Sequence, residues 1–182
     1  MRIIAGKFRG RRLKGPPNEQ TRPTSDRLRE TLFNVLAPRI EGARFLDLCA
    51  GTGAVGIEAL SRAVAHVTFV DQSRKMCGLI ETNLALLSVS QDEYDVVAAE
   101  AFDYLKRRTR KSGQYFDIAF FDPPYATDYD DALNFIGEIL GEDGIVIVEH
   151  HKKKVLADQF SGLTRYRELK QGDSVLSFYR SS

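Results

Sequence analysis

The sequence contains no tryptophan and only two cysteines, Cys49 and Cys77, in 182 residues. These cysteines and the three histidines show neither a disulfide framework nor the spacing of metal ligands, so we predict no metal site and a reducing compartment. No apolar run approaches the ~18 residues of a membrane span. The start, MRIIAGKFRGRRLKG, lacks the apolar segment and cleavage site of a signal peptide. These absences predict a cytoplasmic protein with no membrane segment.

The composition, 43% hydrophobic and 28% charged, is typical of a soluble globular protein. The length suits one domain, which we expect to span residues 1–182. Within it, residues 1–40 are expected to form a basic hairpin and helix extension, and residues 41–182 the core. A monomer is the default expectation.

The net charge is only +1, but the charge is unevenly placed along the chain. Residues 1–29 contain nine basic side chains and two acidic ones. A basic face on a near-neutral protein indicates a polyanionic partner that approaches from one side. The alternative is a solvated N-terminal arm.

Short apolar runs alternate with helical patterns from Arg44 onward. This alternation predicts an α/β protein whose mostly parallel sheet is covered by helices on both faces. Strands are expected at 45–49, 66–70, 94–98, 117–121 and 145–149, with an antiparallel pair at 164–169 and 175–179. Helices are expected from Thr24 or Ser25 to Pro38, from the glycine-rich turn to Ala63, and at 74–88, 101–110 and 130–140.

The segments 2–5 and 11–14 are expected to pair as a small hairpin, and the stretch 150–154, HHKKK, to form a solvated turn. Ligands on parallel sheets bind at the carboxyl ends of the strands. We therefore expect the loops after residues 49, 70, 98 and 121 to line the functional site.

A glycine-rich loop, GTGAVG, occupies residues 51–56 after the first of these strands. Glycines let the backbone approach a ligand closely, and Asp71 ends the next strand, where a carboxylate can accept hydrogen bonds from both ribose hydroxyls. The pattern predicts a cofactor that contains adenosine, NAD included. Asp47 favours S-adenosylmethionine, because a carboxylate attracts its ammonium and sulfonium but repels a pyrophosphate. The structural alternatives are a satisfied strand-end Asp47 and a tight turn without a ligand.

The strongest signal in the chain is Asp122-Pro123-Pro124-Tyr125, which follows the apolar run 118–121. An exocyclic base amine is a poor nucleophile because its lone pair is delocalised into the ring. Hydrogen bonds from the amine to the Asp122 carboxylate and the Pro123 carbonyl would hold its nitrogen toward a methyl donor, and two prolines stiffen the loop. Tyr125 offers a ring on which an unstacked base can lie. The alternative is a proline turn that merely ends a strand.

The chain resembles the bacterial 16S ribosomal RNA guanine-N2 methyltransferases over nearly its whole length. The likeness includes RIIAGKFRGRRL at the start, RPTSDRLRETLFN at 22–34, FLDLCAGTGAVGIEALSR at 45–62 and FDPPY at 121–125. DPPY alone occurs across amino-methyltransferases of DNA, RNA and protein, so the stretch 22–34 is the specific part. The resemblance implies a class I S-adenosylmethionine-dependent methyltransferase fold, Rossmann-like with seven strands. It also implies that the substrate is a guanine of 16S rRNA within a small ribosomal subunit or an assembly intermediate.

The same resemblance implies roles for individual residues. It implies that the ribose of the cofactor lies on Asp71, the adenine on Glu100, and the methionine part on Asp47, Cys49, Ala50, Gly51, Thr52 and Gly53. Gln72, Ala101 and Asp122 would also contact the cofactor. Glu100 stands where the family usually has aspartate, and Asp71 where glutamate is more common. Asp122, beside the cofactor, would hold the guanine with Pro123, Pro124 and Tyr125. Arg9, Arg11, Arg12, Arg22, Arg27 and Arg29 would track RNA phosphates, although Arg22, Arg27 and Arg29 could instead brace the helix over the cofactor.

Other functions stay open. A DNA adenine-N6 or cytosine-N4 methyltransferase fits DPPY, but such enzymes usually add a target-recognition segment, for which residues 126–182 are too short. An NAD-dependent oxidoreductase would need a hydride-transfer site, and the sequence offers no Ser-Tyr-Lys set or zinc ligands. A non-catalytic RNA-binding assembly factor is disfavoured because the glycine loop and DPPY are both intact.

Overall fold

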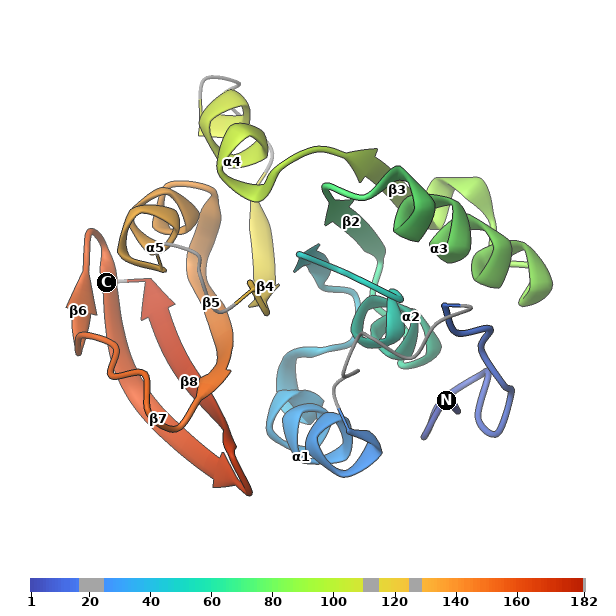
Figure 1. Cartoon of the computed structure of the whole chain (residues 1–182), viewed down its shortest axis with the longest axis horizontal. Coiled ribbons are helices and arrows are strands. Elements are labelled where there is room, and N and C mark those ends of the chain that lie inside the picture. The colour runs from blue at the N-terminus through green and yellow to red at the C-terminus, as the bar shows by residue number, and fades with distance from the viewer. Residues whose placement is uncertain (17–24, 110–114, 125–128, 182) are drawn as a thin grey trace.

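A computed structural model of the chain describes residues 1–16, 25–109, 115–124 and 129–181. Within these ranges eight strands form one sheet (Figure 1). In chain order they are β1 (Arg44–Leu48), β2 (His66–Asp71), β3 (Tyr94–Ala98), β4 (Phe116–Phe121), β5 (Leu140–His151), β6 (Gln159–Phe160), β7 (Leu163–Gln171) and β8 (Ser174–Ser181). Their order across the sheet is β3-β2-β1-β4-β5-β8-β7-β6.

The first five strands run parallel, and β8 joins the sheet antiparallel between β5 and β7. The α/β class and the closing antiparallel pair agree with the sequence prediction, but the expected strand number of seven does not. The additional strand, β6, has two residues and pairs only with the start of β7, so it is too short to show a periodic pattern. β5 also begins at Leu140 rather than at residue 145.

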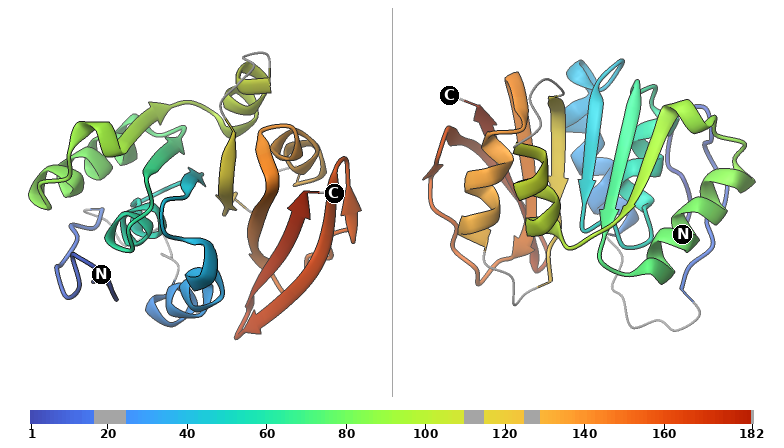
Figure 2. Two further views of the ribbon diagram at one scale, coloured as in Figure 1. Left: turned by 180° about the vertical axis from the view of Figure 1, so that it is seen from behind. Right: turned by 90° about the horizontal axis from the view of Figure 1, so that it is seen from above.

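Five α-helices and two 3₁₀ turns connect the strands in the described ranges. They are α1 (Asp26–Leu36), η1 (Ala37–Arg39), α2 (Ala54–Ser61), α3 (Arg74–Leu86), η2 (Gln91–Glu93), α4 (Ala101–Thr109) and α5 (Tyr129–Gly137). Buried side chains of α1, α2 and α3 share one hydrophobic cluster, and those of α4 and α5 share the other. Figure 2 shows α4 and α5 in front of the sheet and α1 behind it, so helices cover both faces. No helix of the described ranges is long and apolar enough to cross a membrane.

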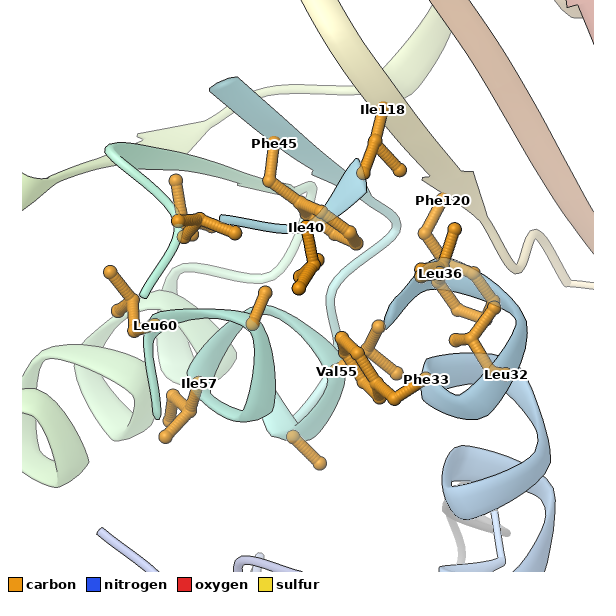
Figure 3. Packing of buried hydrophobic residues seen from close by; sticks show 14 of the residues in the cluster. Leu32, Phe33, Leu36, Ile40, Phe45, Val55, Ile57, Leu60, Ile118 and Phe120 are labelled. Carbon is orange, nitrogen blue, oxygen red and sulfur yellow. The ribbon is translucent and has the colours of Figure 1, made fainter. Parts of the chain in front are cut away.

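Helix α1 begins where its sequence provides a cap. The Ser25 hydroxyl accepts a hydrogen bond from the Leu28 amide at 3.2 Å, as the sequence predicts, while Thr24 lies outside the described residues. Spacings of three and four residues then bury one face of the helix against α2 and the sheet. Figure 3 shows the side chains that meet there, among them Leu32, Phe33, Leu36, Phe45, Val55, Ile118 and Phe120.

The N-terminal segment, residues 1–14, folds back on itself, although only Arg2 and Arg12 form a β-bridge. Backbone bonds from the Ile3 amide to the Arg11 carbonyl (3.1 Å) and from the Gly10 amide to the Ile3 carbonyl (2.9 Å) close it. The predicted hairpin therefore exists as a compact loop with a single bridge.

Side chains of α2 and α3 fix the N-terminal segment to the core. The buried Glu58 carboxylate accepts hydrogen bonds from the Ile4 amide at 2.8 Å and the Ala5 amide at 3.0 Å. Asn83 bonds the Lys14 backbone in both directions, at 2.8 and 3.1 Å. A Cβ at Gly6 would lie 1.7 Å from the Ser61 carbonyl oxygen, so only glycine fits there. The solvated-arm interpretation is therefore wrong for this segment.

Candidate functional site

A pocket of about 660 Å³ opens at the carboxyl ends of the parallel strands. This volume is within the usual range of small-molecule sites, about 300–1,000 Å³. The four loops that were expected to line a site, those after residues 49, 70, 98 and 121, all contribute to its wall. The wall includes Asp47, Cys49, Ala50, Gly51, Thr52, Asp71, Gln72, Glu100, Ala101, Asp122, Pro123 and Pro124. Of the remaining expected residues, Gly53 belongs to the same loop and Tyr125 lies outside the described residues.

Asp47 lies at the base of the pocket with 2% of its surface exposed. The pKa of this carboxyl is raised to about 7. Burial is the largest cause; the Gly56 amide, which donates to Oδ2 at 2.8 Å, lowers the pKa, and the charge of Asp71 raises it. A Cβ at Gly56 would come within 2.3 Å of the Phe69 ring and 3.0 Å of Asp47 Oδ2. Glycine is therefore required at residue 56 for the helix to approach the carboxylate.

The backbone of the glycine loop is unusual at three residues. Cys49, Gly51 and Gly53 all have positive φ, of 65°, 54° and 73°. A left-handed conformation costs energy at a residue with a side chain, and such strain is most often found at functional sites. Burial, and then Asp71, raise the pKa of the Cys49 thiol, so this cysteine stays protonated and is no nucleophile.

Asp71 ties the first two loops of the pocket together. Its Oδ2 accepts the Gly51 amide and its Oδ1 accepts the Ser73 amide, both at 2.8 Å. These bonds fix the carboxylate at the pocket wall, and each oxygen keeps a second acceptor position.

Glu100 directly precedes α4 and also lines the pocket. Its carboxylate accepts the Asp103 amide at 3.0 Å and so satisfies an amide of the first helical turn. The Glu100 side chain therefore caps the start of α4 from within the pocket wall.

Asp122 lies directly after β4, and its amide approaches the Leu48 carbonyl at 3.4 Å. This bond places the Asp122-Pro123-Pro124 turn beside the glycine loop. Burial raises the pKa of the Asp122 carboxyl well above its usual range, and the negative charges of Glu149 and Asp47 raise it further. The site thus contains an acidic group that takes up a proton easily.

The far side of the pocket is formed by residues for which the sequence analysis assigned no role. They come from the start of α1, the start of α5, the end of β5 and the β7–β8 turn: Ser25, Leu28, Tyr129, Glu149, His150, His151, Gln171, Gly172, Asp173 and Ser174. The rule that sites form at the carboxyl ends of parallel strands applies to β5 as well, and it could have identified Glu149.

The expectation of a solvated turn at 150–154 is wrong for its first residue. His150 is 4% exposed, and its Nε2 lies 2.9 Å from the Ser177 hydroxyl. Antiparallel pairing with β8 extends β5 to His151 and encloses the His150 ring. Burial lowers the pKa of His150, so the ring is neutral near pH 7.

The six arginines expected at an RNA surface differ in exposure. Arg9, Arg11, Arg12 and Arg27 are exposed, and Arg22 lies outside the described residues. Arg29 is completely buried, and its Nη2 donates to the Arg2 carbonyl and to Asp26, each at 2.7 Å. The expectation that Arg29 faces phosphates is therefore wrong in this structure, because the N-terminal segment packs over it. Its contacts with the Arg2 carbonyl and Asp26 fit the bracing alternative.

The described part of the chain contains no group of three or more histidine, cysteine, aspartate or glutamate side chains placed to hold a metal ion.

Comparisons with known proteins agree over the whole chain. A family model described as "Conserved hypothetical protein 95" matches residues 1–180. Ribosomal RNA small subunit methyltransferase D of Haemophilus influenzae is 35% identical over 179 residues, which cover 92% of each chain. The solved structure of yhhF from Escherichia coli has a TM-score of 0.88 at 33% identity and covers 100% of this chain and 98% of that one.

A more distant solved structure, SMU.776 complexed with SAH, has a TM-score of 0.71 at 19% identity and covers 85% of this chain and 48% of that chain. At this identity the likeness concerns the fold. Together, the neighbours confirm the fold class that the sequence predicted.

Proposed function

Since this chain belongs to the family of the ribosomal RNA small subunit methyltransferases D and has S-adenosylmethionine as its cofactor, we propose that it methylates the exocyclic N2 of a specific guanine in 16S rRNA. The proposed substrate is the small ribosomal subunit or an assembly intermediate. The observation that carries the proposal is the position of the Asp122-Pro123-Pro124 turn, which shares one pocket with the glycine loop and Asp71.

The cofactor supplies an electrophilic methyl group on a sulfonium. In the proposed complex Asp47 and the loop 49–53 face the charged methionine part, Asp71 and Gln72 the ribose, and Glu100 and Ala101 the adenine. A carboxylate at Asp47 favours the positive charges of that ligand.

The target amine would donate its N–H groups to the Asp122 carboxylate and the Pro123 carbonyl, which orients its lone pair toward the methyl group. Methylation makes the nitrogen acidic, and Asp122, whose pKa is raised, can accept the released proton. The exposed Arg9, Arg11, Arg12 and Arg27 would contact phosphates of the RNA.

The test uses labelled S-adenosylmethionine and small ribosomal subunits from cells that lack this protein, followed by nucleoside analysis of the RNA. We expect label in N2-methylguanosine at one position. Absence of label from the RNA, with cofactor binding confirmed separately, would contradict the proposal and direct the search to DNA or protein amines.

A further inference from the structure

The pocket extends beyond the loops assigned to the cofactor. The ends of β1, β2 and β3 carry the glycine loop, Asp71 and Glu100, and they lie on one side of β4. The end of β5 and the β7–β8 turn lie on the other side of β4 (Figure 1). Their residues line the second half of the pocket. Asp122 directly follows β4 and thus lies at the boundary between the two halves of the pocket. The second half can accommodate a base whose exocyclic amine contacts Asp122.

Glu149 is the acidic residue on β5 in this second half. The parallel register pairs Phe121 with Val148, so the next residues, Asp122 and Glu149, are neighbours across two strands that lie about 4.8 Å apart. β5 is paired on both sides at this level, since Glu149 also faces Leu176 of β8. A residue on a doubly paired strand holds its position well.

Both carboxylates are directed to the same face of the sheet. Phe120 and Ile147 pack in the cluster with α1, whereas Phe121 and Val148 pack in the cluster with α4 and α5. Side chains alternate along a strand, so Asp122 and Glu149 return to the α1 face. Ser25 and Leu28, at the start of α1, line the pocket on that face.

The hydrogen-bonding pattern of the bases decides which base this pair of carboxylates can bind. In guanine the exocyclic amine at N2 lies next to a ring N–H at N1, so two adjacent atoms donate. In adenine and cytosine the exocyclic amine lies next to a ring nitrogen that accepts. While Asp122 and Glu149 are both ionised, their carboxylates side by side provide acceptors only. They match the adjacent donors of guanine and would meet the lone pair of adenine N1 or cytosine N3 unfavourably.

We propose that Glu149 determines the choice of base, by accepting the N1–H of guanine while Asp122 holds the N2 amine. This inference rests on the proposed function and adds the residue that excludes adenine. A site that hydrogen-bonds a particular donor strongly rejects an analogue that lacks it.

The test compares the wild-type protein with Glu149→Gln. The substrates are small subunits reconstituted with either the natural rRNA or an rRNA in which adenine replaces the methylated guanine. Glutamine offers an N–H₂ group to adenine N1 and loses a charged acceptor for guanine N1–H. We expect the preference for guanine, measured as the ratio of kcat/KM for the two substrates, to fall by roughly 10- to 100-fold, the usual effect of one hydrogen bond to a charged group.

Two further variants serve as controls. Glu142→Gln makes the same chemical change on the same strand, at an exposed residue near its opposite end, and should leave the ratio unchanged. Glu149→Asp keeps the carboxylate and should keep the preference for guanine at a lower rate. Affinity for S-adenosylmethionine, measured for every variant, reports whether the protein is folded.

The outcomes separate the two proposals. Absence of N2-methylguanosine with the wild-type protein would contradict the proposed function itself. Normal wild-type methylation together with an unchanged ratio in Glu149→Gln, at any overall rate, would overturn the role of Glu149 alone. A lowered ratio, with N6-methyladenosine appearing in the adenine-containing subunits, would establish it.

Discussion

The carboxyl of Asp47 combines deep burial with a place in the cofactor pocket, so its proton is coupled to both folding and binding. Its pKa of about 7 is above the roughly 3.9 of an unfolded aspartate. Between these values the folded protein binds more protons than the unfolded one. Asp47 therefore lowers the free energy of unfolding as the pH rises through this interval, and the loss is complete above pH 7.

Cofactor binding should show the opposite trend with pH. A cation binds the ionised carboxylate, so protons compete with S-adenosylmethionine below the pKa of about 7. We expect the affinity to rise about tenfold between pH 6 and pH 8, because the ionised fraction rises by about that factor. Titration calorimetry at both values would measure it. Asp47→Asn should bind more weakly and lose most of this dependence; an undiminished dependence would show that another group titrates.

In the proposed function Asp122 acts on the amine that receives the methyl group rather than on the cofactor. Asp122→Ala should reduce kcat by at least about 100-fold, since it removes both an orienting hydrogen bond and a proton acceptor. The dissociation constant of S-adenosylmethionine should stay within a few-fold of the wild-type value. Single-turnover rates and equilibrium binding would separate the two effects. Equal loss of both would assign Asp122 to cofactor binding instead.

At the scale of elements, the N-terminal segment depends on side chains of its neighbours more than on its own structure. Its single β-bridge gives little stability, whereas Glu58 and Asn83 satisfy three of its backbone amides and one carbonyl. Glu58 also pairs with Arg62 at 2.9 Å, which fixes the carboxylate for this task. One residue on α2 thus contributes two of the hydrogen bonds that dock the segment.

Glu58→Gln should loosen this docking. An amide in place of the carboxylate weakens two charged hydrogen bonds, and it directs an N–H group at backbone N–H groups. We expect a loss of about 1–3 kcal/mol in the free energy of unfolding, together with faster hydrogen exchange of the Ile4 and Ala5 amides. Glu30→Gln on the exposed side of α1 is the matched control and should change neither quantity. Unchanged exchange in Glu58→Gln would mean that packing alone holds the segment.

Most elements could be predicted because their signals are local. Ser25 caps α1, and the apolar runs that end at Leu48 and Phe121 predict the strands that lead into the pocket loops. The start of β5 could not be predicted, because Leu140 pairs with Phe116 of β4 and the residues from Gly141 to Gly144 then interrupt the regular register, which resumes at Ile145. The short β6 exists only through its contact with β7.

The candidate site was predictable for the same reason, and only in its cofactor half. Motifs of glycine, proline and aspartate mark that half locally. The second half depends on a tertiary contact, the pairing of β8 with β5 that buries His150. The burial of Arg29 by the N-terminal segment, away from the pocket wall, depends on another. Neither event leaves a pattern near these residues in the sequence.

At the scale of the whole molecule, docking turns the basic N-terminal segment into a fixed surface. Arg9, Arg11 and Arg12 are exposed on a segment that is bonded to α2 and α3, so their charges stand at a set distance from the pocket. A surface of this kind can orient a polyanion before the base enters the site.

Replacing Arg9, Arg11 and Arg12 by glutamine should weaken binding to the small subunit RNA and flatten its dependence on salt. Each phosphate contact contributes a slope of about 0.7–0.9 in log K against log salt, so we expect a reduction of up to about 2–3. Arg167→Gln combined with Arg180→Gln, on the exposed faces of β7 and β8, should leave the slope unchanged. An unchanged slope in the N-terminal triple variant would remove these arginines from the RNA surface.

Because β8 pairs antiparallel between β5 and β7, the sheet can be completed only late in synthesis of the chain. β5 has its second edge covered only when residues 174–181 arrive, and the turn from Gln171 to Ser174 completes the pocket wall at the same moment. During translation one edge of β5 therefore stays unpaired, and an unpaired strand edge favours association with other chains. Pairings so distant in the sequence also form slowly. A nascent chain halted before β8 would contain the glycine loop and Asp122 without the β7–β8 part of the pocket wall, so we expect activity only after β8 has paired with β5.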